Sequence, residues 1–508
     1  MKRVALVVIG GLAFVDLAAP VVVSQSLDAD IRAVAAIPGE PSAVGAAGLS
    51  ANDEPALTLE NELAFDFASG IRRLVIVGGP GGEGAVVRLA RWFKEAAPAR
   101  IRRDWALSAL PRPSDLAGSA PALPERSNDR QSLERWITFQ APDVLVEVRD
   151  DGKSVGLSAI RSSVVRSSEG SAALEKLLAE ATRGSSELHA SIIARTSRRP
   201  IEVAQLLARR YPGTPAISYI PSVAWTNTLK LAAMTEDQTL TAKVRRQTEP
   251  WTSGKQPLFP DRVLLTSLAG TMVFADLGGD ARKLAEQGAK LAAATKDTGI
   301  AEYGQGWTDD MFMSSAILAR MGEFDAAAQR LTSYASRLQR QDGMFIHATD
   351  GPFAWGRGNG FAALGVVELL TFLPEAHPAR AALLDIYRRH MAAVRLQQSP
   401  DGMWREVLDE PGAYREETAT AMLLTAMARG VRLGWIGGGD YDRAVDRAWL
   451  GLLAHIKDDG TVIDVCTGTG AGPTKRYYLD RAALTGADDR GGAMALLASM
   501  EMIALRGR

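Results

Sequence analysis

Residues 307–323, WTDDMFMSSAILARMGE, carry the pattern that decides the fold of the longer part of this 508-residue chain. Apolar residues recur there at spacings of three and four, which predicts an amphipathic helix over 309–322. The same Ala- and Leu-rich pattern returns repeatedly after residue 222. The helices predicted from it are 223–235, 238–250, 261–277, 280–296, 309–322, 324–340, 359–372, 377–398, 417–434, 438–457 and 489–505.

The loops between these helices alternate in length. Residues 277–280, LGGD, join two predicted helices tightly, whereas the loop over 341–359 is long and carries Trp, His, Arg and Asp. Such alternation is typical of helical hairpins whose longer connections gather on one functional rim. Eleven or twelve helices over 222–508 therefore predict an all-α double ring, the (α/α)6 barrel.

The chain before residue 222 has a different texture, in which short β-rich runs alternate with helical ones. This alternation predicts an α/β layer domain with a largely parallel sheet over 25–221. The segment 108–127 is rich in Pro, Ser and Ala, which indicates a loop. The elements predicted here are strands at 74–79 and 142–149 and helices at 86–97 and 171–182.

The first twenty residues, MKRVALVVIGGLAFVDLAAP, combine a basic start, an apolar run and small residues near Ala18 and Ala19. This outline predicts a signal peptide over 1–24 and hence a periplasmic or secreted protein. The alternative is a buried first β-strand of a cytoplasmic protein, because VALVV suits a strand equally well. No other stretch approaches the roughly 18 consecutive apolar residues of a spanning helix, so we expect no membrane span.

Length and charge narrow the class of protein further. A chain of 508 residues is too long for one ordinary core, which predicts two domains. The net charge is −1 with scattered Lys and Arg, so neither a nucleic-acid surface nor a polybasic membrane patch is indicated. The one cysteine, Cys466, excludes an intrachain disulfide and a cysteine-cluster metal site.

The glycine run GGPGGEG at 78–84 follows a predicted strand but matches neither the dinucleotide fingerprint nor the P-loop. The segments LVIVGGPGGEGAVVRLARWF and RWITFQAPDVLVEVR weakly resemble zinc carboxypeptidases. Gly81 stands where that family has a histidine, and His189 is the only histidine before His347. One imidazole cannot hold a catalytic zinc, which usually needs three protein ligands. We expect a degenerate, non-catalytic domain without a metal; peptidase activity is the alternative and would need zinc.

Residues 355–361, WGRGNGF, complement the two aspartates of 307–323. A carboxyl group can transfer protons, Arg357 can bind a carboxylate bidentately, and Trp355 can stack on a pyranose ring. Asn359 adds an amide within the same motif. This set of side chains indicates an acidic sugar as the ligand.

Five motifs in order resemble the unsaturated rhamnogalacturonyl hydrolases of glycoside hydrolase family 105 and, more distantly, the unsaturated glucuronyl hydrolases of family 88. The resemblance covers about 222–508. It implies an (α/α)6 barrel that removes a 4,5-unsaturated uronic acid from the non-reducing end of an acidic oligosaccharide produced by a lyase. The motifs are WTDDMFMSSAILARMGE, QDGMFIHATD, WGRGNGFAALGVVELL, QSPDGMWREVLDEPGAYREETATAMLLTAMARGVRLGW and DGTVIDVCTGTG.

The implied chemistry needs few groups. The C4=C5 double bond is conjugated to the ring oxygen as a vinyl ether, so a carboxylic acid can protonate C4 and leave an oxocarbenium-like centre at C5. Water then adds at C5 with the same carboxylate as base, and the resulting hemiketal opens to release the aglycone. No metal or organic cofactor is expected, and the scheme differs from that of two-carboxylate glycosidases.

By the resemblance, Asp309 matches the catalytic acid/base. Asp310 is the next residue along the helix and points about 100° away, so the two cannot share one role. Asp309 is the favoured acid/base and Asp310 is the alternative one. If Asp309 is the acid/base, Asp310 is a substrate-binding neighbour or a helix N-terminal charge. Asp261, in FPDRVLLTSL, stands roughly where the family has a second catalytic aspartate, which would keep the acid protonated; its alternative is a helix cap.

The remaining predicted contacts are substrate-binding. By the resemblance, His347 matches a site histidine, with a satisfied loop histidine as the alternative, and Trp355 and Arg357 match a stacking indole and a carboxylate-binding guanidinium. Phe361 stands where the family commonly has a second tryptophan. Glu416, in YREETATAM, either orients the site or is structural.

Two further residues and one further function stay open. Asp350, in the short loop 348–354, is an alternative acid, and Arg481 contacts a uronate or pairs with an acid. The alternative function is a non-catalytic carbohydrate-binding or scaffold protein with a retired barrel, which the phenylalanine at 361 favours.

Overall fold

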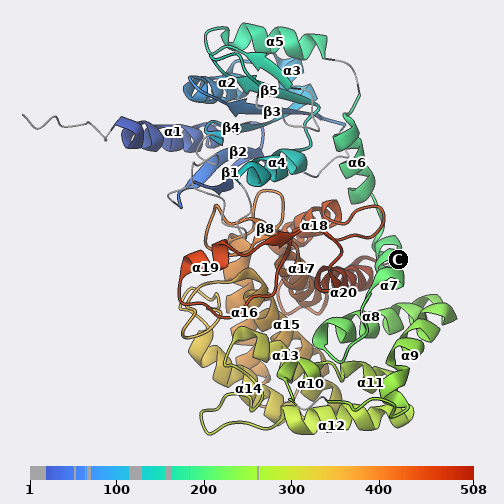
Figure 1. The fold of residues 1–508 in the computed structure, drawn as a ribbon. Helices are drawn as coiled ribbons and strands as arrows, with labels where there is room; N and C mark the ends of the chain where they lie inside the picture. Colours follow the sequence, from blue (N-terminus) through green and yellow to red (C-terminus); the bar gives the residue numbers. More distant parts are fainter. Residues whose placement is uncertain are drawn as a thin grey trace, which may run out of the picture.

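A computed structural model describes residues 19–50, 53–62, 65, 70–113, 129–154, 162–181, 184–259 and 262–507. A six-stranded sheet with its helices forms one end of the molecule, and a ring of helices forms the other (Figure 1). Helix α6, Glu187–Thr196, runs along one side and leads from the sheet region to the ring. The prediction that the chain after residue 222 is mainly helical is confirmed.

The predicted signal segment falls mostly outside the described residues, which begin at residue 19. Helix α1, Ala19–Ala35, crosses the predicted end of that segment at residue 24. No helix in the described chain is long and apolar enough to span a membrane.

The sheet has the strand order β1-β2-β4-β3-β5-β6. Strands β4, β3, β5 and β6 pair in parallel, whereas β1 and β2 form an antiparallel hairpin whose second strand pairs antiparallel with β4. The prediction of a largely parallel sheet is confirmed. The bounds are β1 Ser42–Leu49, β2 Pro55–Asn61, β3 Arg72–Gly78, β4 Trp105–Leu110, β5 Val144–Val148 and β6 Ser162–Val165.

Alternate residues of the central strands supply the two faces of this sheet. Leu74 and Ile76 pack into the core beneath α1, α2 and α5, while Val75 and Val77 pack against α4 on the other face. In Figure 1, α4 lies on the side of the sheet that faces the ring. The helices are α2 Glu83–Glu95, α3 Ala99–Asp104, α4 Asp129–Gln140 and α5 Gly170–Glu180.

One loop prediction in this region is wrong at its start. Residues 108–110, expected in a Pro/Ser/Ala-rich loop, belong to strand β4. Leu107, Ala109 and Leu110 are buried, and the strand pairs along its length with β3. Small residues such as Ser108 fit a strand that is covered on both faces, so composition alone misled the prediction.

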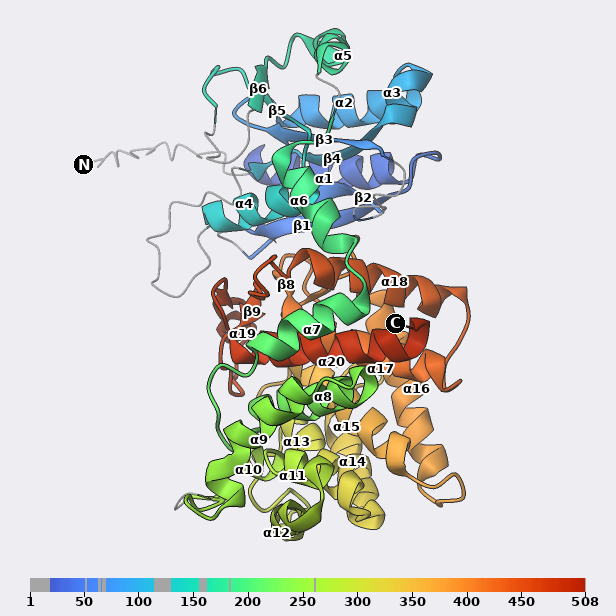
Figure 2. The same cartoon turned by 90° about the vertical axis from the view of Figure 1, so that its right-hand side faces the viewer.

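The ring consists of paired helices. In the described chain, α8, α10 with α11, α13, α15, α17 and α20 pack in sequence around the inside, and α20 closes the circle against α8. Outside them lie α7, α9, α12, α14, α16 and α18 (Figure 2). The bounds are α7 Pro200–Arg210, α8 Tyr219–Thr235, α9 Gln238–Thr252, α10 Leu265–Ala269, α11 Met272–Leu277, α12 Arg282–Ala292, α13 Thr308–Met321, α14 Phe324–Leu338, α15 Gly356–Phe372, α16 Arg380–Leu396, α17 Glu417–Arg432, α18 Gly439–Ala454 and α20 Asp489–Arg506.

Short elements complete the rim of the ring. They are the 3-10 turn Gly279–Ala281, helix α19 Lys475–Leu479, the strand pair β7 Trp404–Arg405 with β8 Arg415–Glu416, and the pair β9 Val465–Cys466 with β10 Ala483–Leu484.

The outer helices are amphipathic and the inner ones are buried nearly all round. Helix α12 buries Ala285, Gly288, Ala289 and Ala292 on one face, whereas α15 is buried from residue 356 through residue 370. An inner helix is covered by its outer partner and by the interior of the ring, so it has no polar face to show.

Two boundaries differ from those predicted. Helix α7, expected in the α/β part, packs against α20 and α8 as an outer helix of the ring, so the ring begins before residue 222. The helix predicted over 261–277 is divided into α10 and α11 around Gly270. A Cβ at Gly270 would lie 2.5 Å from the backbone nitrogen of Ser218, so only glycine fits there. Gly270 lets the two segments approach at that break.

Candidate functional site

The predicted site residues lie where the inner helices begin. Helix α13 begins at Thr308, α15 at Gly356 and α17 at Glu417, each after a long rim loop. Since inner helices run in the same direction through the ring, their first residues meet at one end. Hydrogen bonds between these starts and the rim loops show that this end is one connected site.

Asp309 belongs to a chain of three hydrogen-bonded side chains. His347 Nε2 lies 3.1 Å from Asp309 Oδ2, and His347 Nδ1 lies 2.9 Å from the Tyr478 hydroxyl. The Tyr478 oxygen already accepts the Gly472 N–H at 3.1 Å, so its own hydrogen is free to be donated to Nδ1. That arrangement places a hydrogen on Nε2, directed at the aspartate.

Burial keeps this chain in place while leaving the aspartate partly accessible. The His347 side chain is 0% exposed and that of Asp309 is 15% exposed. Burial raises the pKa of Tyr478 to about 12, so the phenol stays protonated and can act as a donor. Oδ1 of Asp309 has no hydrogen-bond partner among the described residues and is the free oxygen of the carboxylate.

Asp310 is directed away from this chain, as the helical offset predicts. Its Oδ2 accepts the N–H groups of Gln305 and Gly306, at 2.9 and 2.7 Å, and the Tyr334 hydroxyl at 2.8 Å. Burial raises the pKa of Asp310 to about 6. The carboxyl group therefore fastens the loop before α13 to α14, and its predicted substrate contact stays a prediction.

Arg357 is buried, and its guanidinium group donates hydrogen bonds to backbone carbonyl oxygens. Its Nη1 donates to the Cys466 carbonyl at 2.6 Å and its Nη2 to the Thr467 carbonyl at 2.7 Å. Burial alone would lower the pKa of Arg357, but the acidic groups around it, among them Glu416 and Asp309, raise it. A bidentate grip on a substrate carboxylate would require Arg357 to release both carbonyls.

Trp355 lies between Arg357 and the histidine of the chain. The guanidinium carbon of Arg357 is 4.8 Å from the indole centroid, and the His347 ring centroid is 4.4 Å from the Trp355 ring centroid. The indole is only 1% exposed, and its Nε1 has no hydrogen-bond partner in the described chain. In this arrangement the indole packs on His347, and stacking on a sugar would require it to move.

Phe361 packs against inner helices, whereas Asn359 is directed at the loop before α15 and at His390 on the outer helix α16. Asn359 donates to the Phe345 and Trp355 carbonyls and accepts the Phe345 N–H, so its amide fixes the loop before α15. Phe361 is 1% exposed and packs edge-on against Tyr219 with centroids 5.5 Å apart. Their predicted substrate contacts stay predictions.

Glu416 makes the contacts of a helix cap. Its carboxylate accepts the N–H groups of Thr418 and Ala419 at the start of α17, and also that of Cys466 at 2.8 Å. It thereby joins the loop before α17 to strand β9, which fits the structural alternative. Asp261 lies outside the described residues.

Sequence reasoning missed two tyrosines of the site. Tyr219 begins α8, and burial raises its pKa to about 12; the charges of Arg357 and Asp309 also act on it, which places it beside the site. Tyr478 stands in KRYYLD, residues 475–480, which directly precede Arg481, the one residue near it that the sequence analysis named. Neither tyrosine has a motif around it that signals a contact more than a hundred residues away.

A glycine-rich loop, 467–472, covers the site. The Gly470 N–H donates to the Tyr477 hydroxyl at 3.2 Å, and a Cβ on Gly470 would lie 3.4 Å from the Trp307 ring. A Cβ on Gly472 would lie 2.2 Å from the Tyr477 ring, so glycine is required there. The loop therefore lies against Trp307, the residue that directly precedes α13.

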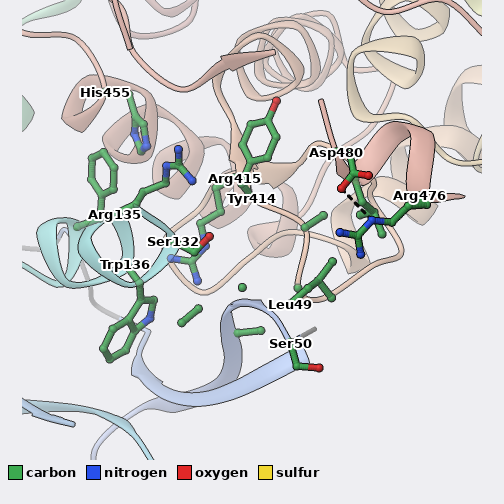
Figure 3. A pocket seen from close by; sticks show the side chains of 17 residues that line it. Leu49, Ser50, Ser132, Arg135, Trp136, Tyr414, Arg415, His455, Arg476 and Asp480 are labelled. Carbon is green, nitrogen blue, oxygen red and sulfur yellow. Dashed lines mark ion pairs between the residues drawn. The ribbon is translucent and has the colours of Figure 1, made fainter. Parts of the chain in front are cut away.

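A separate cavity of about 80 Å³ lies at the seam between the sheet region and the ring (Figure 3). Strand β1 and helix α4 line it on one side and the rim of the ring on the other. Asp309 and His347 are not among its lining residues. The side chains labelled in Figure 3 are Leu49, Ser50, Ser132, Arg135, Trp136, Tyr414, Arg415, His455, Arg476 and Asp480.

No group of three or more His, Cys, Asp or Glu side chains lies close enough to hold a metal ion within the described ranges.

Several known proteins are similar to this chain. The family model of Glycosyl Hydrolase Family 88 matches residues 217–506. An unsaturated 3S-rhamnoglycuronyl hydrolase from Alteromonas sp. (strain LOR) is 28% identical over 175 residues, 31% of this chain and 42% of that protein. The unsaturated rhamnogalacturonyl hydrolase YesR from Bacillus subtilis (strain 168) is 26% identical over 180 residues, 32% of this chain and 50% of that protein. The chain thus spans about half the length of these curated relatives.

The chain also matches solved structures of the same fold, and each match covers nearly the whole length of the solved protein. A family 105 glycoside hydrolase from C. acetobutylicum has a TM-score of 0.54 at 19% identity, covering 60% of this chain and 99% of that one. A possible family 105 member from Salmonella enterica serovar Paratyphi A also has a TM-score of 0.54, at 20% identity, covering 59% and 93%. These likenesses show the fold alone, an α/α barrel. Since the family model spans more than half of the chain, including Asp309, His347 and Tyr478, this protein belongs to Glycosyl Hydrolase Family 88.

Proposed function

We propose that the protein hydrolyses oligosaccharides that carry a 4,5-unsaturated uronic acid at the non-reducing end, and that Asp309 is the acid and base of the reaction. The names of the two curated relatives support this substrate class. The observation that carries the proposal is the hydrogen bond between the buried His347 and Asp309 Oδ2, which leaves Oδ1 of the same carboxylate free.

The reaction follows from the substrate's vinyl ether. Protonated Asp309 gives its proton to C4, and positive charge develops at C5 and the ring oxygen. Water adds at C5 and returns a proton to Asp309, so the enzyme ends in its starting state. The hemiketal at C5 then opens to a ketone and leaves a hemiacetal at C1, and collapse of that hemiacetal to an aldehyde releases the aglycone as an alcohol. Donation from His347 Nε2 keeps the carboxylate oriented during both transfers.

The proposal includes a division of the chain into two domains, an α/β domain followed by the barrel. The boundary lies between helices α6 and α7, at residues 197–199, because α7 packs within the ring. We assign no catalysis to the α/β domain, since the resemblance to zinc carboxypeptidases would require a histidine where Gly81 stands, and His189 is bound to Asp143 at 2.8 Å.

The test is an assay with unsaturated galacturonyl and glucuronyl disaccharides that follows loss of the ultraviolet absorbance of the double bond. Wild-type protein is expected to consume at least one of them, and Asp309→Asn to lose at least about a hundredfold in kcat, as expected for a general acid and base. Asp350→Asn, a change at an exposed loop aspartate, is the matched control and should behave like wild type. Binding of the disaccharides without turnover would instead support the retired-barrel alternative.

A further inference from the structure

Two buried ion pairs cross the seam between the sheet region and the ring. Arg415 Nη2 lies 2.7 Å from both carboxylate oxygens of Glu60 on β2, and Arg135 Nε on α4 lies 2.8 Å from Asp464 Oδ1. The Glu60 side chain is 0% exposed and that of Asp464 is 3% exposed. A charge buried this deeply is costly unless it is paired, so each pair strongly favours one relative position of the two regions.

Contacts within the sheet region fix the positions of its two charged side chains, Glu60 and Arg135. Glu60 accepts the Thr58 hydroxyl at 2.7 Å and Trp136 Nε1–H at 3.0 Å, so β2 and α4 together orient its carboxylate toward the ring. Arg135 is the neighbour of Trp136 on α4, and both line the seam cavity (Figure 3).

Both ion pairs end on the loops that build the site. Arg415 directly precedes Glu416, and Asp464 lies two residues before Cys466. These loops are also joined to each other, because Glu416 accepts the Cys466 N–H at 2.8 Å and the Glu417 N–H donates to the Asp464 carbonyl at 3.0 Å. The seam therefore fixes a pair of linked loops.

Asp464 shows that this loop is held in an unfavourable shape. Its φ is 61°, a left-handed conformation that is uncommon for a residue other than glycine. Such a conformation persists where the surroundings over-determine it, and here Arg135 and His455 both lie against the Asp464 carboxylate. Without Arg135 the loop would lose the contact that comes from outside the ring.

The linked loops in turn hold the catalytic side chains. Arg357 donates to the Cys466 and Thr467 carbonyls and packs on Trp355. Trp355 packs on His347, which bonds to Asp309. A continuous series of contacts therefore runs from Glu60 and Arg135 to the reacting carboxylate.

We propose that the sheet region is a positioning element of the active site, and that Glu60 and Arg135 are the residues through which it acts. The effect on turnover rests on the proposed function. The effect on loop order does not, because the ion pairs act on the loops whatever the substrate is. A sheet region that was only an appended module would not need buried charges aimed at the site loops.

The experiment uses the full chain with Glu60→Ala and Arg135→Ala, and with Glu60→Gln and Arg135→Lys as milder changes in case the alanine variants fold poorly. Hydrogen–deuterium exchange is expected to become faster over 404–417 and 462–468, where the site loops lie. On an unsaturated disaccharide, kcat should fall about tenfold while KM changes less, a size of effect found for residues along coupled networks. Arg135→Lys should restore part of the loss.

Two controls separate positioning from general instability. Asp53→Asn removes an exposed ion pair with Arg476 that also crosses the seam and should leave exchange in both loops and kcat unchanged. Phe93→Ala makes a hole in the sheet core without touching either buried pair, so it should destabilise the sheet region and spare kcat.

The proposal is overturned if both loops of the Glu60 and Arg135 variants exchange at the wild-type rate, or if Phe93→Ala lowers kcat as much as they do. A wild-type protein that turned over no unsaturated disaccharide would refute the proposed function alone, because the exchange measurement would still decide whether the sheet region orders the loops.

Discussion

At the scale of single residues, the decisive feature is the hydrogen-bonded series Tyr478, His347 and Asp309. The phenol is expected to fix the histidine tautomer that donates to the aspartate. Tyr478→Phe should therefore lower kcat about fivefold, since one hydrogen bond is worth about 1 kcal/mol. It should also change the pH profile, because Nδ1 then lacks its hydroxyl partner and is free to bind a proton.

Tyr477→Phe is the matched control for that change. Its hydroxyl also accepts an N–H of the glycine-rich loop, from Gly470, but it has no contact with the histidine. Steady-state kinetics across pH should show an altered profile for the Tyr478 variant only. Equal profiles in the two variants would mean that the phenol serves the loop and not the histidine.

Asp310 carries a prediction about stability and pH. Burial raises its pKa from 3.8 to about 6, so the folded protein binds more protons than the unfolded chain between about pH 4 and pH 6. The unfolding free energy of wild type should fall by about 3 kcal/mol through this window because of this one group. The Asp310→Asn variant has no carboxyl group to titrate at this position. Its unfolding free energy relative to that of wild type should therefore rise by about 3 kcal/mol from pH 4 to pH 7.

Denaturant unfolding of both proteins at several pH values measures this difference. Asp350→Asn, at an exposed position, should show no such trend relative to wild type. A difference between wild type and Asp310→Asn that did not vary with pH would show that the buried carboxyl is not the titrating group.

At the scale of elements, the approach of α15 to α13 brings the site helices together. A Cβ on Gly365 would lie 2.4 Å from the Met311 carbonyl oxygen, which is backbone and cannot rotate away. Gly365→Ala should therefore cost about 1–3 kcal/mol of unfolding free energy despite the higher helix propensity of alanine. It should also lower kcat, because α13 carries Asp309.

Gly437→Ala controls for the glycine replacement itself. A Cβ at Gly437 meets nothing within 4 Å, so both stability and kcat should stay close to wild type. Thermal unfolding and the disaccharide assay on the same samples compare the two variants. A Gly365→Ala protein as stable as wild type would show that α15 can move outward without cost.

The elements are also where sequence reasoning worked best. Helices α13, α14 and α17 begin and end within two residues of their predicted bounds, because apolar spacing is a local signal. The break between α10 and α11 was missed, since it depends on the backbone of residues 217–218 packing against Gly270. Residues 200–210 were assigned to the α/β domain, because their place in the ring depends on packing against α20 and α8.

At the scale of the whole molecule, the buried pairs at the seam predict cooperative unfolding. Glu60 with Arg415 and Arg135 with Asp464 stabilise both regions only while they are together. Wild type should therefore unfold in one calorimetric transition, and the double variant Glu60→Ala, Arg135→Ala should show two, with the sheet region melting first. Two separate transitions already present in wild type would contradict this coupling.

The sequence by itself determined the alternation of strands and helices, the run of amphipathic helices and the motifs around Asp309 and His347, because each is written in residues close together along the chain. Only the tertiary structure decided that Arg357 holds backbone carbonyls, that Tyr478 completes the series from 131 residues beyond His347, and that Glu60 meets Arg415 across 355 residues. Periodicity specifies which face of an element is buried, but the partner of a buried polar group depends on packing between distant segments. No local pattern records that packing.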